Sequence, residues 1–123
     1  MIRPYLKSDY KDIAAWYGTH NKPVPTPGAL PRVGYIVTGI AVGFLYQTDA
    51  NFCMLEGFVS PKNSDHFKRN KALDEIAEAL QAAAKELGFK HIVAITNNSA
   101  IIKRARKHGF KDMGPHEMLS KEI

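Results

Sequence analysis

The clearest pattern of apolar and polar positions lies in the second half of the chain. Apolar residues recur three or four positions apart from Leu73 to Leu87, and Gly88 follows them. This spacing places one buried stripe on an α-helix, and a glycine directly after a helix commonly ends it. The stripe consists of Leu73, Ile76, Ala77, Leu80, Ala83, Ala84 and Leu87. The pattern therefore predicts a long amphipathic helix that ends at Gly88.

Three strands are predicted before this helix. Val33–Thr38 and Ile40–Thr48 are separated by a single glycine, and a short polar turn leads on to Phe52–Ser60. Strands joined by such short turns pair antiparallel with one another. A glycine interrupts each strand, and Gly57 in the third strand indicates a bulge or a close approach of the backbone. We therefore expect an antiparallel meander.

The first thirty residues predict a strand, a short helix and a connector. Ile2–Leu6 is a short strand, Ser8 is the expected N-cap of the helix, and Gly18 is its expected end. Residues 23–31 contain four prolines in nine positions, which excludes a helix and an inner strand. The apolar face of the helix consists of Ile13, Trp16 and Tyr17. The proline segment is predicted to be a stiff connector across the surface.

The last third of the chain predicts one more strand–helix pair and two final strands. Phe89–Ile95 has an apolar centre without alternation, which is typical of a strand buried on both faces. Asn97 or Asn98 caps the next helix, whose apolar face is Ile101, Ile102 and Ala105 and which ends at Gly109. Two strands are predicted after it, and their ranges are Phe110–Met113 and His116–Ile123.

The predicted order is thus β-α-βββ-α-β-α-ββ. A meander does not belong to a doubly wound sheet, whereas the β-α-β piece after it requires parallel pairing and a right-handed crossover. A mixed sheet with helices on both faces meets both demands. The sequence therefore predicts a mixed α/β fold, and its 123 residues are expected to form a single domain over 1–123.

Composition excludes several classes of protein. Hydrophobic residues make up 45% of the chain and charged residues 24%, as in ordinary globular proteins. No apolar run approaches the roughly 18 residues of a membrane span, and the opening residues lack the apolar core of a signal peptide. The lone Cys53 lies in an apolar run and is expected to be buried, which fits a reducing cytoplasm. The five histidines show no metal-ligand spacing, so we predict no metal site.

The formal net charge of +5 favours an anionic partner only weakly. Lysine and arginine gather at 62–71 and at 103–111. Three explanations are open for each cluster: a solvated face, a site for a phosphate-bearing ligand, or a site for a nucleic acid. No aromatic residues that would stack on bases are interleaved with the clusters, which makes nucleic acid the least favoured of the three.

Four short motifs, together with the order of elements, resemble those of one enzyme family. The opening Ile2-Arg3-Pro4…Ser8-Asp9-Tyr10…Ile13, the strand end Phe58-Val59-Ser60-Pro61, the segment Asn98…Gly109-Phe110 and the closing His116-Glu-Met-Leu carry the likeness. They resemble the GNAT superfamily of acyl-CoA-dependent N-acetyltransferases, whose fourth strand often ends in V-x-P. The likeness covers nearly the whole chain and is greatest to small GNAT-like proteins of bacteriophages.

The resemblance implies acetyl-CoA as co-substrate, with the backbone of Phe58 and Val59 binding its pantetheine amides. The family places R/Q-x-x-G-x-G/A before the long helix, where bare backbone N–H groups approach the pyrophosphate. The corresponding stretch here, His66–Leu73, contains no glycine. Positive charge is then expected to replace some amide contacts, although these residues equally suit a solvated first helical turn. The candidate residues are Lys68, Arg69, Asn70, Lys71 and Ala72.

Three further positions follow from the same resemblance. Glu56 lies on the strand that would border the cofactor cleft and is the candidate general base, the alternative being a strand glutamate that faces solvent or pairs with a lysine. Asn98 would contact the pantetheine arm or would simply cap a helix. Ala105 stands where many members carry a tyrosine that serves as general acid, so Tyr46 or Tyr35 would have to reach in.

Three functions from different classes remain open at this point. The first is an acyl-CoA-dependent N-acyltransferase that acts on a small-molecule or protein amine. The second is a catalytically inactive GNAT-like protein that serves as a binding or accessory component, for example of a phage. The third is a small basic nucleic-acid binder. A membrane partner is not expected, and either a monomer or a homodimer is compatible with the sequence.

Overall fold

The computed structural model describes residues 1–96, 98–114 and 117–123. Five strands, three α-helices and two short 3₁₀ turns follow one another in these ranges. In chain order they are β1 (Ile2–Pro4), η1 (Lys7–Asp9), α1 (Tyr10–Thr19), η2 (Pro27–Ala29), β2 (Val33–Val37), β3 (Ala41–Gln47), β4 (Phe52–Val59), α2 (His66–Glu86), β5 (His91–Val93) and α3 (Ser99–Lys107).

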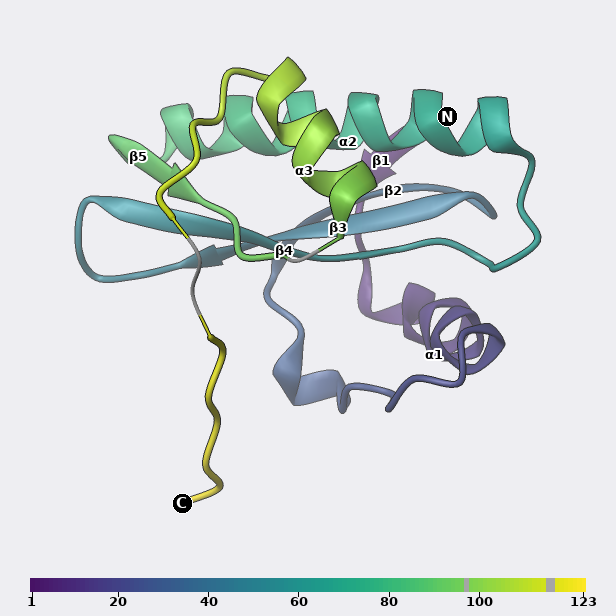
Figure 1. The fold of residues 1–123 in the computed structure, drawn as a ribbon. Helices are drawn as coiled ribbons and strands as arrows, with labels where there is room; N and C mark the ends of the chain where they lie inside the picture. The colour runs from purple at the N-terminus through teal and green to yellow at the C-terminus, as the bar shows by residue number, and fades with distance from the viewer. Residues whose placement is uncertain (97, 115–116) are drawn as a thin grey trace.

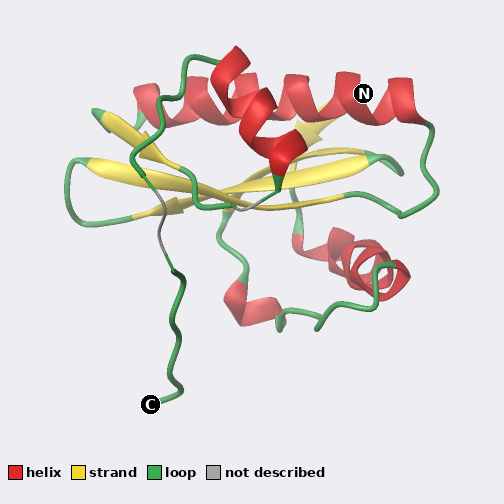
Figure 2. Cartoon of the chain, viewed as in Figure 1, coloured by secondary structure: helices red, strands yellow, loops and turns green. Residues whose placement is uncertain are grey.

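The strands form one mixed sheet in the order β1-β2-β3-β4-β5. The first four are antiparallel neighbours, and only β5 runs parallel to its neighbour β4. Helices α2 and α3 cover one face of the sheet, and α1 with η2 lies on the other (Figures 1 and 2). The predicted mixed α/β fold with helices on both faces is therefore confirmed. No helix of the described ranges is both long and apolar enough to cross a membrane.

Two apolar cores fill the space on either side of the sheet. On the α2 face, the helix stripe packs on alternate residues of the strands, and Ile76, Leu80 and Leu45 are fully buried. On the α1 face, Ile13 of the helix packs against Phe44 of β3. The predicted stripes of both helices face the sheet except at Leu87, which follows the last residue of α2 and is 50% exposed.

The chain start differs from the prediction in how α1 begins and ends. Ser8 is exposed and does not cap α1, whose N-cap residue is Asp9. The Asp9 carboxylate accepts hydrogen bonds from Arg3, at 2.7 and 2.8 Å, and from the Leu6 N–H at 2.8 Å. The bond from Arg3 lowers the pKa of Asp9, despite opposing burial. The helix also runs past Gly18, to Thr19.

A bulge in β4 reverses which face its side chains occupy. Glu56 pairs with Phe44, but the next pair is Val59 with Val42, so β4 contains one residue more than β3 over this stretch. Gly57 supplies the extra residue, with φ at +72°. As a result Phe58 packs with the core on the α2 face, while Glu56, opposite Phe44, lies on the α1 face.

The C-terminal part of the chain corrects two predictions. Neither Phe110–Met113 nor the described part of His116–Ile123 is a strand, and His116 itself lies outside the described residues. The strand predicted over Phe89–Ile95 is shorter, and His91 and Val93 are exposed. The exposure of His91 and Val93 follows from the first finding, because without further strands β5 is the edge of the described sheet.

We expect Gly57→Ala to lower the free energy of unfolding by about 1–3 kcal/mol, since a left-handed backbone is strained for alanine. The added Cβ would also lie 3.0 Å from the Phe44 ring. Urea unfolding monitored by circular dichroism measures the effect. Gly18→Ala is the matched control: it lies in α1 with nothing within 4 Å of the new Cβ and is expected to be neutral or stabilising. Equal stability of the two variants would contradict the role given to the bulge.

Candidate functional site

The candidate site lies where β4 and β5 separate. The parallel pairing runs from Phe52 with His91 to Met54 with Val93 and stops there, although β4 continues to Val59. On that side, no strand of the described chain pairs with the last five residues of β4. Unpaired backbone N–H and C=O groups along a strand are ready to bind an extended ligand.

A hollow follows this unpaired half of β4 on the α2 face, and we call it the slot. It is a partly open hollow with a cavity volume of about 70 Å³. Its walls come from β4, from α2, from the chain after β5 and from α3. The lining residues are Leu55, Phe58, Leu73, Ala77, Ala94, Ile101, Arg104, Ala105, His108 and Phe110. The slot is thus apolar, apart from Arg104 and His108.

One carboxylate of α2 holds α3 as the wall of the slot. Asp74 accepts hydrogen bonds from Arg104 at 2.9 Å, from Lys107 at 2.9 Å and from His108 at 3.1 Å. Arg104 also donates to Asn70, at 2.8 Å to its side-chain oxygen. Burial opposes the charge of Asp74, but the three hydrogen bonds outweigh burial and lower the pKa of Asp74 to about 2. None of the residues of α3 is buried, so this ionic cluster joins α3 to α2 across a partly exposed interface.

Glu56 lies on the other face of β4 from the slot. Its Oε2 atom is buried, and no hydrogen-bond partner for it occurs among the described residues. The sequence left open a lysine partner for this carboxylate, and none of the ion pairs in the described ranges includes it. A buried acceptor without a donor is uncommon in folded proteins, and it marks a position that a ligand or water can complete.

Two tyrosines lie near the Glu56 carboxylate. Burial raises the pKa of Tyr17 and of Tyr46, and the negative charge of Glu56 raises both further. Tyr46 therefore shares the face of Glu56, whereas Tyr35 packs with the core on the α2 face. Of the two tyrosines considered from the sequence, only Tyr46 lies on the Glu56 face. Tyr17 was not identified as a site residue, because a residue at i+4 in an apolar helical stripe reads as core packing.

Two tyrosine hydroxyls bind the proline connector, residues 23–31, on the α1 face of the sheet. Tyr10 donates a hydrogen bond to the Pro25 carbonyl at 2.6 Å, and Tyr46 donates one to the Ala29 carbonyl at 3.4 Å. At the other end of α1, His20 Nε2 lies 2.7 Å from the Ser60 carbonyl. These contacts join α1, the connector and the end of β4 into one wall beside Glu56.

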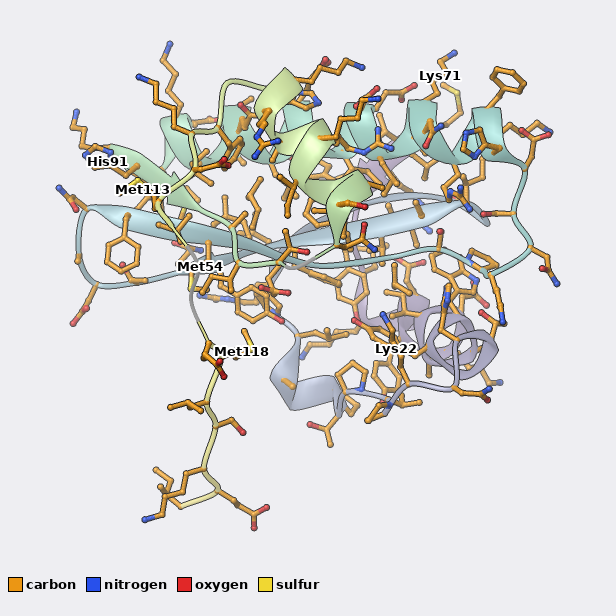
Figure 3. The ribbon with its side chains drawn as sticks, viewed as in Figure 1. Lys22, Met54, Lys71, His91, Met113 and Met118 are labelled. Carbon is orange, nitrogen blue, oxygen red and sulfur yellow. The ribbon has the colours of Figure 1, made fainter. Side chains whose placement is uncertain are left out.

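The stretch proposed for phosphate binding lies inside α2 rather than before it. The helix begins at His66, and Asp65 caps it by accepting a hydrogen bond from the Lys68 N–H at 2.9 Å. Lys71 is exposed on the outer side of α2 (Figure 3), whereas Ala72 is buried in the core. Only side chains are therefore available along most of this stretch, since its backbone N–H groups belong to the helix.

Two of the polar side chains in this region already have partners. Arg69 Nη2 lies 2.9 Å from His66 Nδ1, and Asn70 Nδ2 lies 3.1 Å from His66 Nε2. With the bond from Arg104 to Asn70, these contacts form a polar row along the groove between α2 and α3. Within the described residues, Lys68 and Lys71 make no side-chain hydrogen bond or ion pair, whereas one Arg69 nitrogen contacts His66 and Asn70 is bound by Arg104 of α3.

The remaining candidates divide between the slot and the cap of α3. The Phe58 side chain lines the slot, and Val59 is buried on the α1 face. Asn98 caps α3 by accepting hydrogen bonds from the N–H groups of Ala100 and Ile101, at 2.9 and 3.1 Å. Ala105 lines the slot, so a methyl group stands where the related family often has a tyrosine. Within the described ranges, no group of three or more His, Cys, Asp or Glu side chains is arranged to hold a metal ion.

Several solved structures with a similar fold are named as acetyltransferases. An acetyltransferase from Trypanosoma brucei has a TM-score of 0.70 at 13% identity, over 98% of this chain and 99% of that one. Rv2747 from Mycobacterium tuberculosis, solved with CoA and NLQ, has a TM-score of 0.70 at 16% identity, over 98% and 76% of the two chains. The aminoglycoside N-acetyltransferase AAC(6')-Iy, solved with CoA, has a TM-score of 0.69 at 13% identity over the full length of both.

Comparison of the amino-acid sequence with known families and proteins finds no match. No family model matches the chain, and no curated protein matches it. The structural likeness shows that this chain has the fold of the GNAT acetyltransferases, as its motifs suggested. The closer likeness to bacteriophage members stays a prediction.

We expect Asp74→Asn to lower the free energy of unfolding at pH 7 by about 2 kcal/mol, because Asp74 is only 25% exposed and its carboxylate accepts hydrogen bonds from Arg104, Lys107 and His108. A carboxyl whose pKa is lowered by folding contributes stability above its unfolded pKa and loses it as the pH falls. The difference between the two proteins should therefore fade from about pH 5 to about pH 2. Thermal unfolding across this range measures it.

Asp112→Asn is the matched control, since the Asp112–Arg106 pair is 62% and 59% exposed and should change stability little. An Asp74→Asn variant as stable as this control at pH 7 would contradict the role of the ionic cluster.

Proposed function

We propose that this protein is an acyl-CoA-dependent N-acyltransferase that moves an acyl group, acetyl in the simplest case, from CoA to an amine. One observation carries the proposal: the unpaired half of β4 borders an apolar slot on one face and presents the buried, unpartnered oxygen of Glu56 on the other. Because β5 does not continue beside β4, a ligand tail bound along this edge can reach from one face to the other. The CoA-bound neighbours of the same fold support the proposal.

The chain's own groups divide into binding and chemical roles. The backbone of Phe58 and Val59, at the unpaired edge of β4, binds the amides of an extended pantetheine arm by strand-like hydrogen bonds. Lys68, Arg69 and Lys71 attract the phosphates by charge. Asn70 contributes indirectly, since it holds Arg104, and Asn98 does so by fixing the start of α3.

Acyl-CoA, when bound, supplies the activated acyl group as a thioester. Glu56 accepts a proton from the acceptor ammonium, directly or through one water, and thereby frees the nitrogen lone pair for attack. Its Oε2 atom has no donor in the described structure and keeps its lone pairs available. Ala105 cannot donate a proton to the thiolate that leaves. An ordinary thiol has a pKa of about 8.5, so its thiolate leaves near neutral pH without a dedicated acid.

The acceptor enters from the α1 face. The wall of α1, the connector and Tyr46 surrounds Glu56 there, and two aromatic rings with one carboxylate suit a positively charged amine. The acceptor is a small molecule or an amine of a protein.

A second candidate is a GNAT-like protein that has lost catalysis and binds a partner. One observation favours it: α2 begins at His66, so no glycine loop exposes backbone N–H groups to a pyrophosphate, and the Asp65 carboxylate occupies the helix start. Isothermal titration calorimetry with CoA separates the two candidates. A ligand at a hundred times its dissociation constant also adds about 2.7 kcal/mol to stability, which a thermal shift detects. Absence of both signals would favour the second candidate.

We expect Glu56→Gln to lower kcat/KM by about 100- to 10,000-fold, as loss of a general base does. Release of free CoA from acetyl-CoA in the presence of a panel of primary amines measures turnover. Stability should stay equal or rise, because the change removes a buried charge-bearing oxygen without a partner. Glu78→Gln, on the exposed side of α2, is the control. Full turnover by Glu56→Gln, with CoA affinity unchanged, would remove Glu56 from the chemistry.

We expect Lys68→Ala and Arg69→Ala together to weaken CoA binding by about tenfold, since each removes a charged donor near the start of α2. Titrations of CoA at several salt concentrations measure this, and the variant should show a shallower salt dependence. Lys85→Ala, in the last turn of the same helix, provides the control. Equal affinities of the double variant and the control would mean that the phosphates bind elsewhere.

A further inference from the structure

The unpaired edge of β4 is closed at one end. Met54 pairs with Val93, so a ligand that lies along the edge beside residues 55–59 has to end where the two strands meet. Under the proposed function, on which this inference rests, CoA enters from the start of α2 and its pantetheine arm runs along the edge toward Met54. The acyl group beyond the thioester cannot continue along the strand. It therefore has to turn toward one face of the sheet.

The two faces offer different surroundings at this turn. The α1 face presents the Glu56 carboxylate, with Tyr17 and Tyr46 near it. The α2 face presents the slot, whose lining side chains on β4 are Leu55 and Phe58. An aliphatic chain gains free energy when it leaves water for apolar surroundings, whereas beside Glu56 it would take water from a carboxylate. The slot is thus the better place for an acyl chain, and the α1 face stays free for the amine.

The slot does not suit the pantetheine arm. That arm contains two amides, and burying an amide without a hydrogen-bond partner costs free energy. The polar side chains among the lining residues of the slot are Arg104 and His108, and both already bind Asp74. The amides find partners in the backbone groups of the strand edge instead. An occupant of the slot itself should carry no polar groups.

Three alanines keep the slot hollow. Ala77 lies on α2, Ala94 just after β5 and Ala105 on α3. The resulting cavity volume is about 70 Å³. An apolar cavity of about 150 Å³ holds one benzene molecule, so about 70 Å³ corresponds to about three carbon atoms.

We propose that the acyl group that this protein transfers is a short aliphatic chain of the butyryl class, whose carbons beyond the carbonyl occupy the slot. An acetyl group has one such carbon and leaves most of the slot empty, so the lining side chains lack contacts there. A butyryl group has three such carbons and fills the slot. An octanoyl group has seven, and its last carbons extend beyond the slot into water.

Chain length leaves the transfer step itself unchanged. Glu56 takes one proton from the acceptor ammonium, and the nitrogen then bonds to the carbonyl carbon. The C–S bond breaks, and its electron pair stays on the sulfur. The second proton that the nitrogen releases reaches the thiolate through water and neutralises it.

Isothermal titration calorimetry of the full chain with CoA, acetyl-CoA, butyryl-CoA and octanoyl-CoA tests the proposal and needs no amine. We expect butyryl-CoA to bind about 15-fold more tightly than acetyl-CoA, because two further methylene groups leave water and each contributes about fourfold. Octanoyl-CoA should bind no more tightly than butyryl-CoA.

Variants of the alanines test whether the slot causes this preference. Ala105→Leu fills the slot from α3 and should remove the preference for butyryl-CoA over acetyl-CoA. Ala94→Leu fills it from the other wall, at an exposed position, and should have the same effect. Ala100→Leu is the matched control, since this alanine is exposed on α3 and does not line the slot, and it should keep the preference. Circular dichroism checks that each variant folds.

The outcomes separate this inference from the acyltransferase proposal. Absence of binding by all four compounds would overturn the acyltransferase proposal and this inference with it. Binding of CoA and acetyl-CoA, with butyryl-CoA no tighter than acetyl-CoA, would overturn this inference alone. A preference for butyryl-CoA that persists in both slot variants would mean that the chain lies outside the slot, which overturns it as well.

Discussion

The short parallel pairing between β4 and β5 is the constraint on which the rest of the site depends. Only three residue pairs join the two strands, and beyond Met54 the edge of β4 has no strand beside it in the described structure. The bulge at Gly57 lies in this unpaired half of β4 and changes which face of the sheet the following side chains occupy. In a regular strand Glu56 and Phe58 would share one face, whereas here Phe58 lines the slot and Glu56 lies behind it. A carboxylate and an apolar slot thus meet across one open strand edge.

The wall opposite β4 is held by charge rather than by apolar burial. None of the residues of α3 is buried, and Arg104, Lys107 and His108, near its C-terminal end, converge on Asp74 of α2. Cations at that end of a helix are also favoured by the helix dipole. The apolar contribution to this wall comes from just beyond the helix, where Phe110 packs with the core on the α2 face.

How much of the fold and of the candidate site could be predicted depends on how far apart in the sequence the interacting residues lie. The stripe of α2 and the three strands of the meander follow from local patterns, and they place Glu56 on the strand that borders the slot. Asp74 and Arg104 are 30 residues apart in the sequence, and nothing local in either segment indicates their contact. Ser8 was the expected N-cap of α1, but the helix begins after Asp9, which Arg3 holds from six residues earlier in the sequence. The exposure of β5 depends on a missing neighbour rather than on its own sequence.

The start of α2 differs from a glycine loop in the groups that it offers to an anion: charged side chains in place of free backbone N–H donors. A glycine loop before the helix would offer fixed backbone N–H donors to a phosphate. In this chain the helix begins at His66 instead, which adds turns and buries Ala72 in the core. Lys68 and Arg69 then stand in the first turns, where cations oppose the helix dipole by a few tenths of a kcal/mol each, and the Asp65 cap offsets part of that cost. Charge on flexible side chains tolerates variation in the position of an anion, so under the proposed acyltransferase function this helix start would place the phosphates less precisely than a glycine loop does.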